Sequence, residues 1–197
     1  MRVRRPGPRA ADAAVRTGVE GFVLAGGLST RFGSDKALVL HRGRPLIRHA
    51  LAALEELGGT PRVVARDHGP YREFAHVFVV SERAGRGPAE GLRAALAACS
   101  TPLAVVLAAD MPGVTGAALR RLLDARDDPS IEAVCFQQGG RRHPLPGVYA
   151  ASLRRLWEGT PPESLHAVLE AARAVTVGTE DAATVRNVNR PGDLENG

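Results

Sequence analysis

Short apolar segments alternate with longer amphipathic segments along almost the whole chain. Continuous apolar runs predict buried strands, and apolar residues spaced three and four apart predict helices. The predicted strands are 19–25, 61–65, 76–80, 102–109, 131–136, an extended piece at 144–150, and short strands at 174–177 and 184–188. The predicted helices are 45–57, 88–99, 115–125, 151–157 and 163–172. Strands that alternate with helices and are apolar on both faces indicate an α/β fold, with a mostly parallel sheet covered on both sides.

This architecture also predicts where function should be sought. In such sheets ligands bind beyond the carboxyl ends of the strands, near the point where the strand order reverses. The loops that follow Ala25, Ala65, Val80 and Ala109 are therefore the candidate site loops.

The first 18 residues, "MRVRRPGPRAADAAVRTG", have a different composition. They contain five arginines, together with proline and glycine, and nothing periodic to bury, which predicts a disordered basic tail and no secretory signal. Residues 19–197 are expected to form one domain. Because the tail can by itself account for the net charge of +5, this domain is close to neutral. With only 4% aromatic residues, a nucleic-acid partner is not favoured.

Two further observations argue against a membrane-spanning protein and against one held together by disulfides or by cysteine-bound metal. No apolar run reaches the length that a membrane span needs, roughly 20 residues. The two cysteines, Cys99 and Cys135, lie in apolar segments and form neither a disulfide framework nor a metal set, which indicates a reducing cytoplasm.

The loop after the first strand, in "FVLAGGLSTRFGSDKALV" (22–39), combines glycines, hydroxyl groups and two cations. Its spacing matches neither the P-loop pattern nor G-x-G-x-x-G. Even so, glycines allow a tight turn that offers N–H groups to anionic oxygens. Arg31 adds a guanidinium fork that suits phosphate, and Lys36, the only lysine in the chain, adds a compact charge. The segment therefore predicts a phosphate-binding loop.

The same segment resembles the N-terminal signature of nucleotidyltransferases, L-A-G-G-x-S-x-R-x-G-x-D-K. It is most similar to the molybdenum cofactor guanylyltransferase branch, which joins GMP to molybdopterin. Further similar segments occur in the family's order over residues 19–195: "GPAEGL" (87–92), "LAADMP" (107–112), "RHPLPGVY" (142–149) and "NVNRPGDL" (187–194). The resemblance implies a three-layer α/β/α Rossmann-like nucleotidyltransferase fold, with transfer of GMP from GTP to molybdopterin and release of pyrophosphate.

The resemblance also implies a set of site residues. The catalytic residues would be Lys36, Arg31 and Asp110. The nucleotide would be bound by Leu24, Ala25, Gly26, Gly27, Leu28, Ser29, Thr30, Gly33, Lys36, Asp67, Gly87, Pro88, Glu90, Gly91 and Asp110. The acceptor would be bound by Arg141, Arg142, His143, Asn187 and Asn189.

A magnesium ion is expected at Asp110. This carboxylate closes the most apolar strand, where a triphosphate would repel it unless a cation lay between them, and Mg²⁺ bound by one or two carboxylates plus substrate phosphates is the usual solution. The resemblance assigns the same role to Asp110 and adds Asn189 as a second metal or substrate contact.

Several positions depart from the family pattern. Ala89 and Glu90 stand where the family has Leu-Ala. Glu90 is either an acceptor for guanine N1–H and N2–H or an exposed acid in the first turn of a helix. Asp67 stands in a loop where the family often has asparagine.

These departures leave alternatives open. One is another nucleotidyltransferase of the same fold, with a cytidylyl donor or with a sugar-phosphate or phospholactate acceptor. Another is a non-catalytic nucleotide-binding protein. Transient contacts with cofactor-delivering proteins or molybdoenzymes also stay open.

Overall fold

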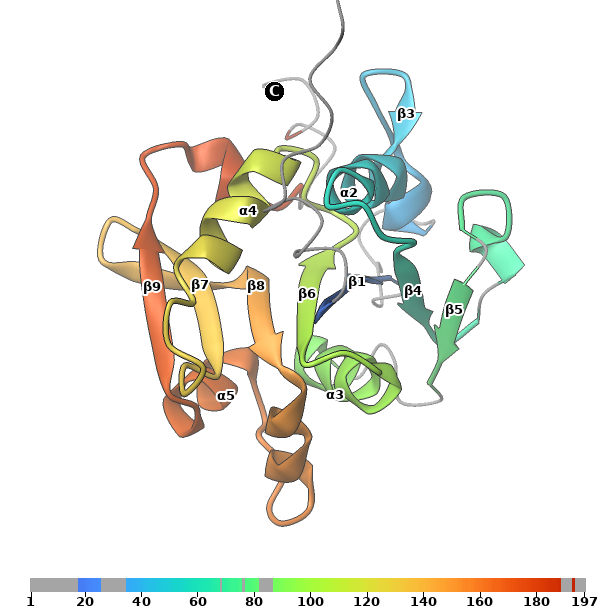
Figure 1. The fold of residues 1–197 in the computed structure, drawn as a ribbon. Coiled ribbons are helices and arrows are strands. Elements are labelled where there is room, and N and C mark those ends of the chain that lie inside the picture. The colour runs from blue at the N-terminus through green and yellow to red at the C-terminus, as the bar shows by residue number, and fades with distance from the viewer. Residues whose placement is uncertain are drawn as a thin grey trace, which may run out of the picture.

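The computed structural model describes residues 18–25, 35–67, 69–75, 77–81, 87–188 and 193. Within them, a seven-stranded sheet has the order β5-β4-β1-β6-β8-β7-β9 (Figure 1). The strands are β1 Val19–Leu24, β4 Arg62–Ala65, β5 Val77–Val80, β6 Leu103–Ala108, β7 Ala133–Gln138, β8 Arg141–Ala150 and β9 Ala174–Gly178. Among these strands β8 alone runs antiparallel to its neighbours, so the predicted, mostly parallel sheet is confirmed.

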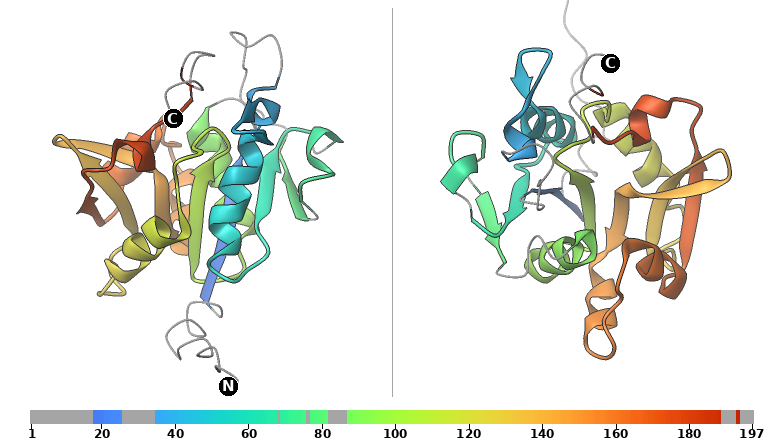
Figure 2. Two further views of the ribbon diagram at one scale, coloured as in Figure 1. Left: turned by 90° about the horizontal axis from the view of Figure 1, so that it is seen from above. Right: turned by 180° about the vertical axis from the view of Figure 1, so that it is seen from behind.

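Helices cover both faces of this sheet (Figures 1 and 2). One face packs against α2 (Leu46–Glu55) and α4 (Gly116–Asp124). The other packs against α3 (Pro88–Ala98), η3 (Ala151–Trp157) and α5 (Leu165–Ala171). The α/β/α layering is therefore confirmed. No helix in the described ranges combines the length and the apolar composition that crossing a bilayer requires.

The helix α2 shows why the apolar spacing fixes these layers. Its buried residues are Leu46, Ile47, Ala50, Leu51, Ala53 and Leu54. This spacing places one continuous apolar stripe against the sheet. A Cβ at Gly21 would lie only 2.9 Å from a methyl carbon of Leu54, so this glycine lets α2 approach the central strand closely.

The last predicted strand, 184–188, is wrong. Its first two residues instead end η4 (Ala182–Val185), a short 3-10 helix, and residues 186–188 are irregular. The carboxylate of Asp181 accepts hydrogen bonds from the Ala183 N–H (3.0 Å) and the Thr184 hydroxyl (2.9 Å). A side chain that caps its own backbone in this way favours a turn over a strand. The predicted helix 151–157 is likewise a 3-10 helix, η3.

The order of the strands creates a switch point beside β1. Val23 of β1 pairs with Val63 of β4 on one side and with Leu107 of β6 on the other. The chain proceeds from β1 to β4 and β5, then crosses through α3 to β6 on the opposite side of β1. Because the strands are parallel, their carboxyl ends share one edge, where α/β proteins bind ligands.

Backbone hydrogen bonds continue this pairing past the ends of the strands. The Ala25 N–H donates to the Val64 carbonyl at 2.9 Å, and the Ala109 N–H donates to the Leu24 carbonyl at 3.0 Å. The first residues after β1 and β6 are therefore neighbours, although one lies near the start of the chain and the other near its middle.

We expect Gly113→Ala to destabilise the fold. A Cβ at Gly113 would lie 2.3 Å from the carbonyl oxygen of Ala183, a backbone atom that cannot rotate away. The added methyl group should force η4 away from the loop after β6 and lower the free energy of unfolding by about 1–3 kcal/mol. The melting temperature should then fall by about 2–4 °C per kcal/mol in a chain of this size.

The matched control is Gly159→Ala, because a Cβ there meets nothing within 4 Å. Thermal denaturation followed by circular dichroism compares the two variants. Equal melting temperatures would contradict the close packing of η4 on this loop.

Candidate active site

The contact that defines the site is an ion pair across the switch point. The Nζ atom of Lys36 lies 2.5 Å from Oδ2 of Asp110, and the two side chains are 15% and 19% exposed. Asp110 lies in the turn that follows β6, whereas Lys36 opens η1 (Lys36–Leu38) beyond β1. A pair that is largely shielded from water is screened less by salt than a surface pair. The structure thus brings together two of the three residues that the sequence predicts to be catalytic.

The backbone around Lys36 is fixed by its neighbours. Oδ1 of Asp35 accepts a hydrogen bond from the Ala37 N–H at 3.0 Å, which caps η1. Ala37 itself is only 4% exposed and belongs to the core. The other carboxylate oxygen of Asp35 accepts a hydrogen bond from the buried Tyr71 hydroxyl. The chain's only lysine therefore stands on a short turn that is held from two sides.

Asp35 is the aspartate of the family signature, but the sequence assigned no role to it or to Tyr71. An aspartate at the start of a turn is a typical cap, so Asp35 carries a local signal. Tyr71 carries none, because its partner lies 36 residues earlier in the chain.

The second oxygen of Asp110 fits a cation. Oδ1 is buried and has no hydrogen-bond partner among the described residues. A buried carboxylate oxygen without a donor is costly, and hard divalent cations take such oxygens as ligands. Within the described ranges, no group of three or more His, Cys, Asp or Glu side chains lies together. The donor chemistry therefore fits an ion such as Mg²⁺, which takes one protein carboxylate and completes its shell from phosphates and water.

The C-terminal segment approaches this carboxylate through its backbone. The Val188 N–H donates to the carbonyl oxygen of Asp110 at 2.9 Å. This bond places the exposed Asn187 beside the loop that carries Asp110. Asn189, the predicted second metal contact, lies outside the described residues. So do the other predicted loop residues, Gly26, Gly27, Leu28, Ser29, Thr30, Arg31 and Gly33.

The predicted residues at the start of α3 form a compact junction with β1. Gly87 caps α3 with φ of 111°, a conformation that favours glycine, and Pro88 occupies the first turn, where its missing N–H costs nothing. A Cβ at Gly91 would lie 3.0 Å from a methyl carbon of Leu24. Gly91 therefore lets the start of α3 approach the carboxyl end of β1, beside Ala25.

Two predicted acidic residues have local partners. Oε2 of Glu90 lies 2.8 Å from Nε of Arg93, one turn further along α3, and the Glu90 side chain is 19% exposed. Oδ1 of Asp67, which follows β4, accepts a hydrogen bond from the Gly69 N–H at 2.8 Å and so shapes the turn into η2 (Gly69–Tyr71).

The predicted acceptor residues Arg141, Arg142 and His143 begin β8. His143 pairs with Phe136, near the carboxyl end of β7, and β7 runs parallel to β6. These residues therefore lie at the same edge of the sheet as Asp110. Partial burial, followed by the charges of Arg141 and His166, lowers the pKa of His143 below its ordinary value. At pH 7 we therefore expect a neutral imidazole beside two guanidinium groups.

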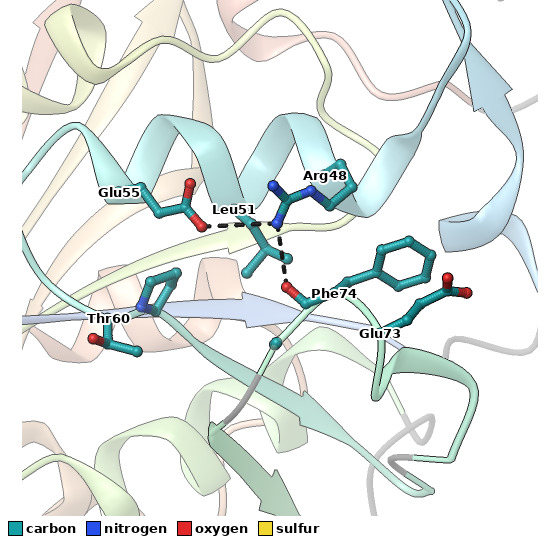
Figure 3. Close-up of a pocket in the computed structure, with 8 residues that line it drawn as sticks. Arg48, Leu51, Glu55, Thr60, Glu73 and Phe74 are labelled. Atoms are coloured by element: carbon teal, nitrogen blue, oxygen red, sulfur yellow. Dashed lines mark hydrogen bonds and ion pairs between the residues drawn. The ribbon is translucent and has the colours of Figure 1, made fainter.

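A separate groove of about 430 Å³ lies beside α2 (Figure 3). Arg48 crosses it, donating a hydrogen bond to the Phe74 carbonyl at 3.2 Å and lying 3.8 Å from the Glu55 carboxylate. Thr60 lies just before β4 at the amino end of that strand. The groove is therefore at the opposite edge of the sheet from Asp110 and is not part of the candidate site.

Comparison with known proteins gives a consistent result. Residues 21–183 match the family model of the MobA-like NTP transferase domain. The chain is 32% identical over 175 residues to a protein of Deinococcus radiodurans named "Probable molybdenum cofactor guanylyltransferase", covering 87% of this chain and 90% of that protein. It is 38% identical over 104 residues to the molybdenum cofactor guanylyltransferase of Xanthomonas euvesicatoria, covering 52% of each. The chain thus spans about half the length of the latter relative.

A solved structure supports the fold. Molybdopterin-guanine dinucleotide biosynthesis protein A from Archaeoglobus fulgidus superposes with a TM-score of 0.72 at 23% identity, covering 90% of this chain and 95% of that one. At this identity the likeness establishes the architecture alone.

We expect the Lys36–Asp110 pair to be energetically coupled. Lys36→Met leaves the Asp110 carboxylate without its cation, and Asp110→Asn leaves the ammonium without its anion, so each single variant should lose stability. The loss in free energy of unfolding should be about 1–3 kcal/mol smaller in the double variant than the sum of the losses in the two single variants. Urea unfolding of the four proteins measures this coupling. Strictly additive losses would show that the contact carries no interaction energy.

Proposed function

Because this chain belongs to the MobA-like NTP transferase family, we propose that it transfers GMP from GTP to molybdopterin and releases pyrophosphate. The names of its relatives support this choice of donor and acceptor. The observation that carries the proposal is the contact between Lys36 and Asp110, at the edge of the sheet where a nucleotide would lie.

The proposed reaction is an in-line displacement at the α-phosphorus of GTP. An oxygen of the acceptor's terminal phosphate forms a new bond to this phosphorus. The bond from the phosphorus to the α–β bridging oxygen breaks, and that oxygen leaves with the electron pair as part of pyrophosphate. Since the attacking oxygen is already anionic, no general base is needed. Catalysis then consists of positioning and charge stabilisation.

Lys36 would stabilise the charge that develops on the α-phosphoryl group. Its ammonium is a compact charge on a flexible stem, so it can follow the phosphorus as the bonds change. Arg31 and the N–H groups of residues 28–33 would hold the β- and γ-phosphates. Asp110, with Asn189, would hold Mg²⁺, whose Lewis acidity would polarise the phosphate oxygens when it is bound.

The remaining polar residues would select the substrates. We assign Glu90 to the guanine base, as acceptor from N1–H and N2–H, with Arg93 holding its carboxylate in place. The acceptor's phosphate would be bound by Arg141, Arg142, His143 and Asn187, because guanidinium groups match phosphate geometry. The free, buried Cys99 and Cys135 are compatible with a cytoplasmic location, which we also propose.

A nucleotide panel tests the proposal directly. Purified protein with Mg²⁺ and molybdopterin should release pyrophosphate from GTP at least about tenfold faster than from ATP, CTP or UTP, a difference of about 1.4 kcal/mol. Preference for CTP would indicate a cytidylyltransferase. Turnover with another phosphorylated acceptor, but not with molybdopterin, would reassign the acceptor. Nucleotide binding without any turnover would indicate a binding protein.

We expect Lys36→Arg to lower kcat by at least about tenfold, or about 1.4 kcal/mol. A guanidinium keeps the positive charge but is wider and more rigid, so it should follow the reacting phosphorus less well. The KM for GTP should change less than kcat does. Steady-state pyrophosphate release measures both constants, and near-normal turnover would contradict the assigned role.

Asp110→Asn should weaken the apparent affinity of the enzyme for Mg²⁺. An amide oxygen carries no charge and binds a hard cation less strongly, so half-maximal activity should require at least about tenfold more Mg²⁺. The matched control is Asp127→Asn, which makes the same change at an exposed carboxylate after α4. An unchanged Mg²⁺ titration for Asp110→Asn would assign the metal to another residue.

A further inference from the structure

We propose that Asp35 and Tyr71 form a positioning pair that fixes Lys36 at the active site. The two carboxylate oxygens of Asp35 have different partners. One accepts from the Ala37 N–H at 3.0 Å, and the other accepts from the Tyr71 hydroxyl. Asp35 is thereby the link between the turn that carries Lys36 and a separate loop of the protein. The catalytic part of this inference rests on the proposed function.

Tyr71 is a fixed point on which Asp35 can anchor. Its side chain is 1% exposed and belongs to the core that α2 and α4 share with the sheet. Its backbone is held as well, because its carbonyl accepts hydrogen bonds from the Phe74 N–H (2.9 Å) and the Ala75 N–H (3.2 Å). A buried ring on an anchored backbone leaves its hydroxyl few alternative positions.

The constraint passes from Asp35 to Lys36 through the turn. The Leu38 N–H donates to the Asp35 carbonyl at 3.0 Å, and the Val39 N–H donates to the Lys36 carbonyl at 3.1 Å. The buried Ala37 prevents the turn from moving outward. A lysine side chain has many rotamers, so an anchored backbone limits where its ammonium can reach. The contact of Lys36 with Asp110 therefore depends on the cap.

The pair also joins two loops that follow neighbouring strands. Tyr71 ends η2, which lies in the same connection after β4 as Asp67. Asp35 lies in the connection after β1. Because Asp67 is expected at the nucleotide, the hydrogen bond between Tyr71 and Asp35 ties this loop to the lysine that would act on the α-phosphate.

The single lysine allows a test that needs no substrate. Protein grown with [¹³C]lysine gives side-chain NMR signals from Lys36 alone. Tyr71→Phe removes only the hydroxyl and should shift or broaden the Lys36 ε-CH₂ signal. It should also lower kcat for GTP by about tenfold and change KM by less than about twofold, because the variant alters the position of a group used in the transition state.

The matched control is the chain's other tyrosine. Tyr149 is also fully buried, and its hydroxyl donates to the Pro144 carbonyl at 2.6 Å. Tyr149→Phe removes an equally buried hydroxyl and should leave the Lys36 signal unchanged. A lysine signal that moves in both variants would indicate general loosening of the fold and overturn the proposal.

Variants of Asp35 give a second, graded test. Asp35→Ala removes both hydrogen bonds and should disturb the Lys36 signal most. Asp35→Asn keeps an oxygen for the Ala37 N–H and places an amide beside the tyrosine oxygen, so it should restore much of the signal and of kcat. An unmoved lysine signal in both Tyr71→Phe and Asp35→Ala would overturn the proposal, whatever happens to turnover. The NMR signal of Lys36 tests the positioning pair even if the protein does not use GTP. The kcat values test it only if the proposed function is correct.

Discussion

The pairing of β1 between β4 and β6 is the constraint on which the site depends. Parallel pairing puts the carboxyl ends of the three strands at one edge, and the reversal of the strand order beside β1 leaves that edge open to a ligand. The backbone bonds of Ala25 and Ala109 extend the pairing by one residue on each side. The segments just beyond β1 and β6 must therefore meet, and they carry Lys36 and Asp110.

The charges at this edge contribute little to stability. A partly buried ion pair contributes little net stability, because removing both groups from water offsets much of their attraction. The buried Oδ1 of Asp110, without a hydrogen-bond donor among the described residues, adds a further cost. A fold selected only for stability would place apolar side chains here. The site that we propose, for a phosphate and a cation, would account for the ammonium, the carboxylate and the unsatisfied oxygen together.

Close backbone packing holds the parts of the site in position. Gly91 lets α3 approach Leu24, and Gly113 lets η4 lie against the loop after β6. In both places a larger residue would push away an element that borders the site. Along with the cap at Asp35, these contacts mean that the residues around the proposed nucleotide are positioned by the core and not by flexible loops alone.

The sequence by itself determined the layers and the identity of the family. Buried strands such as β1, β4 and β6 are contiguous apolar segments, and α2 has a regular apolar stripe, so local pattern was sufficient to find them. The loop signature likewise indicated Lys36, and the separate segment "LAADMP" (107–112) indicated Asp110. Tertiary structure decided the rest. It placed the end of η4 and an irregular segment where a strand over 184–188 was expected. It also joined Tyr71 to Asp35 and Lys36 to Asp110, pairs that lie 36 and 74 residues apart. Such contacts follow from the order in which strands pair, and no local spacing of apolar and polar residues encodes that order.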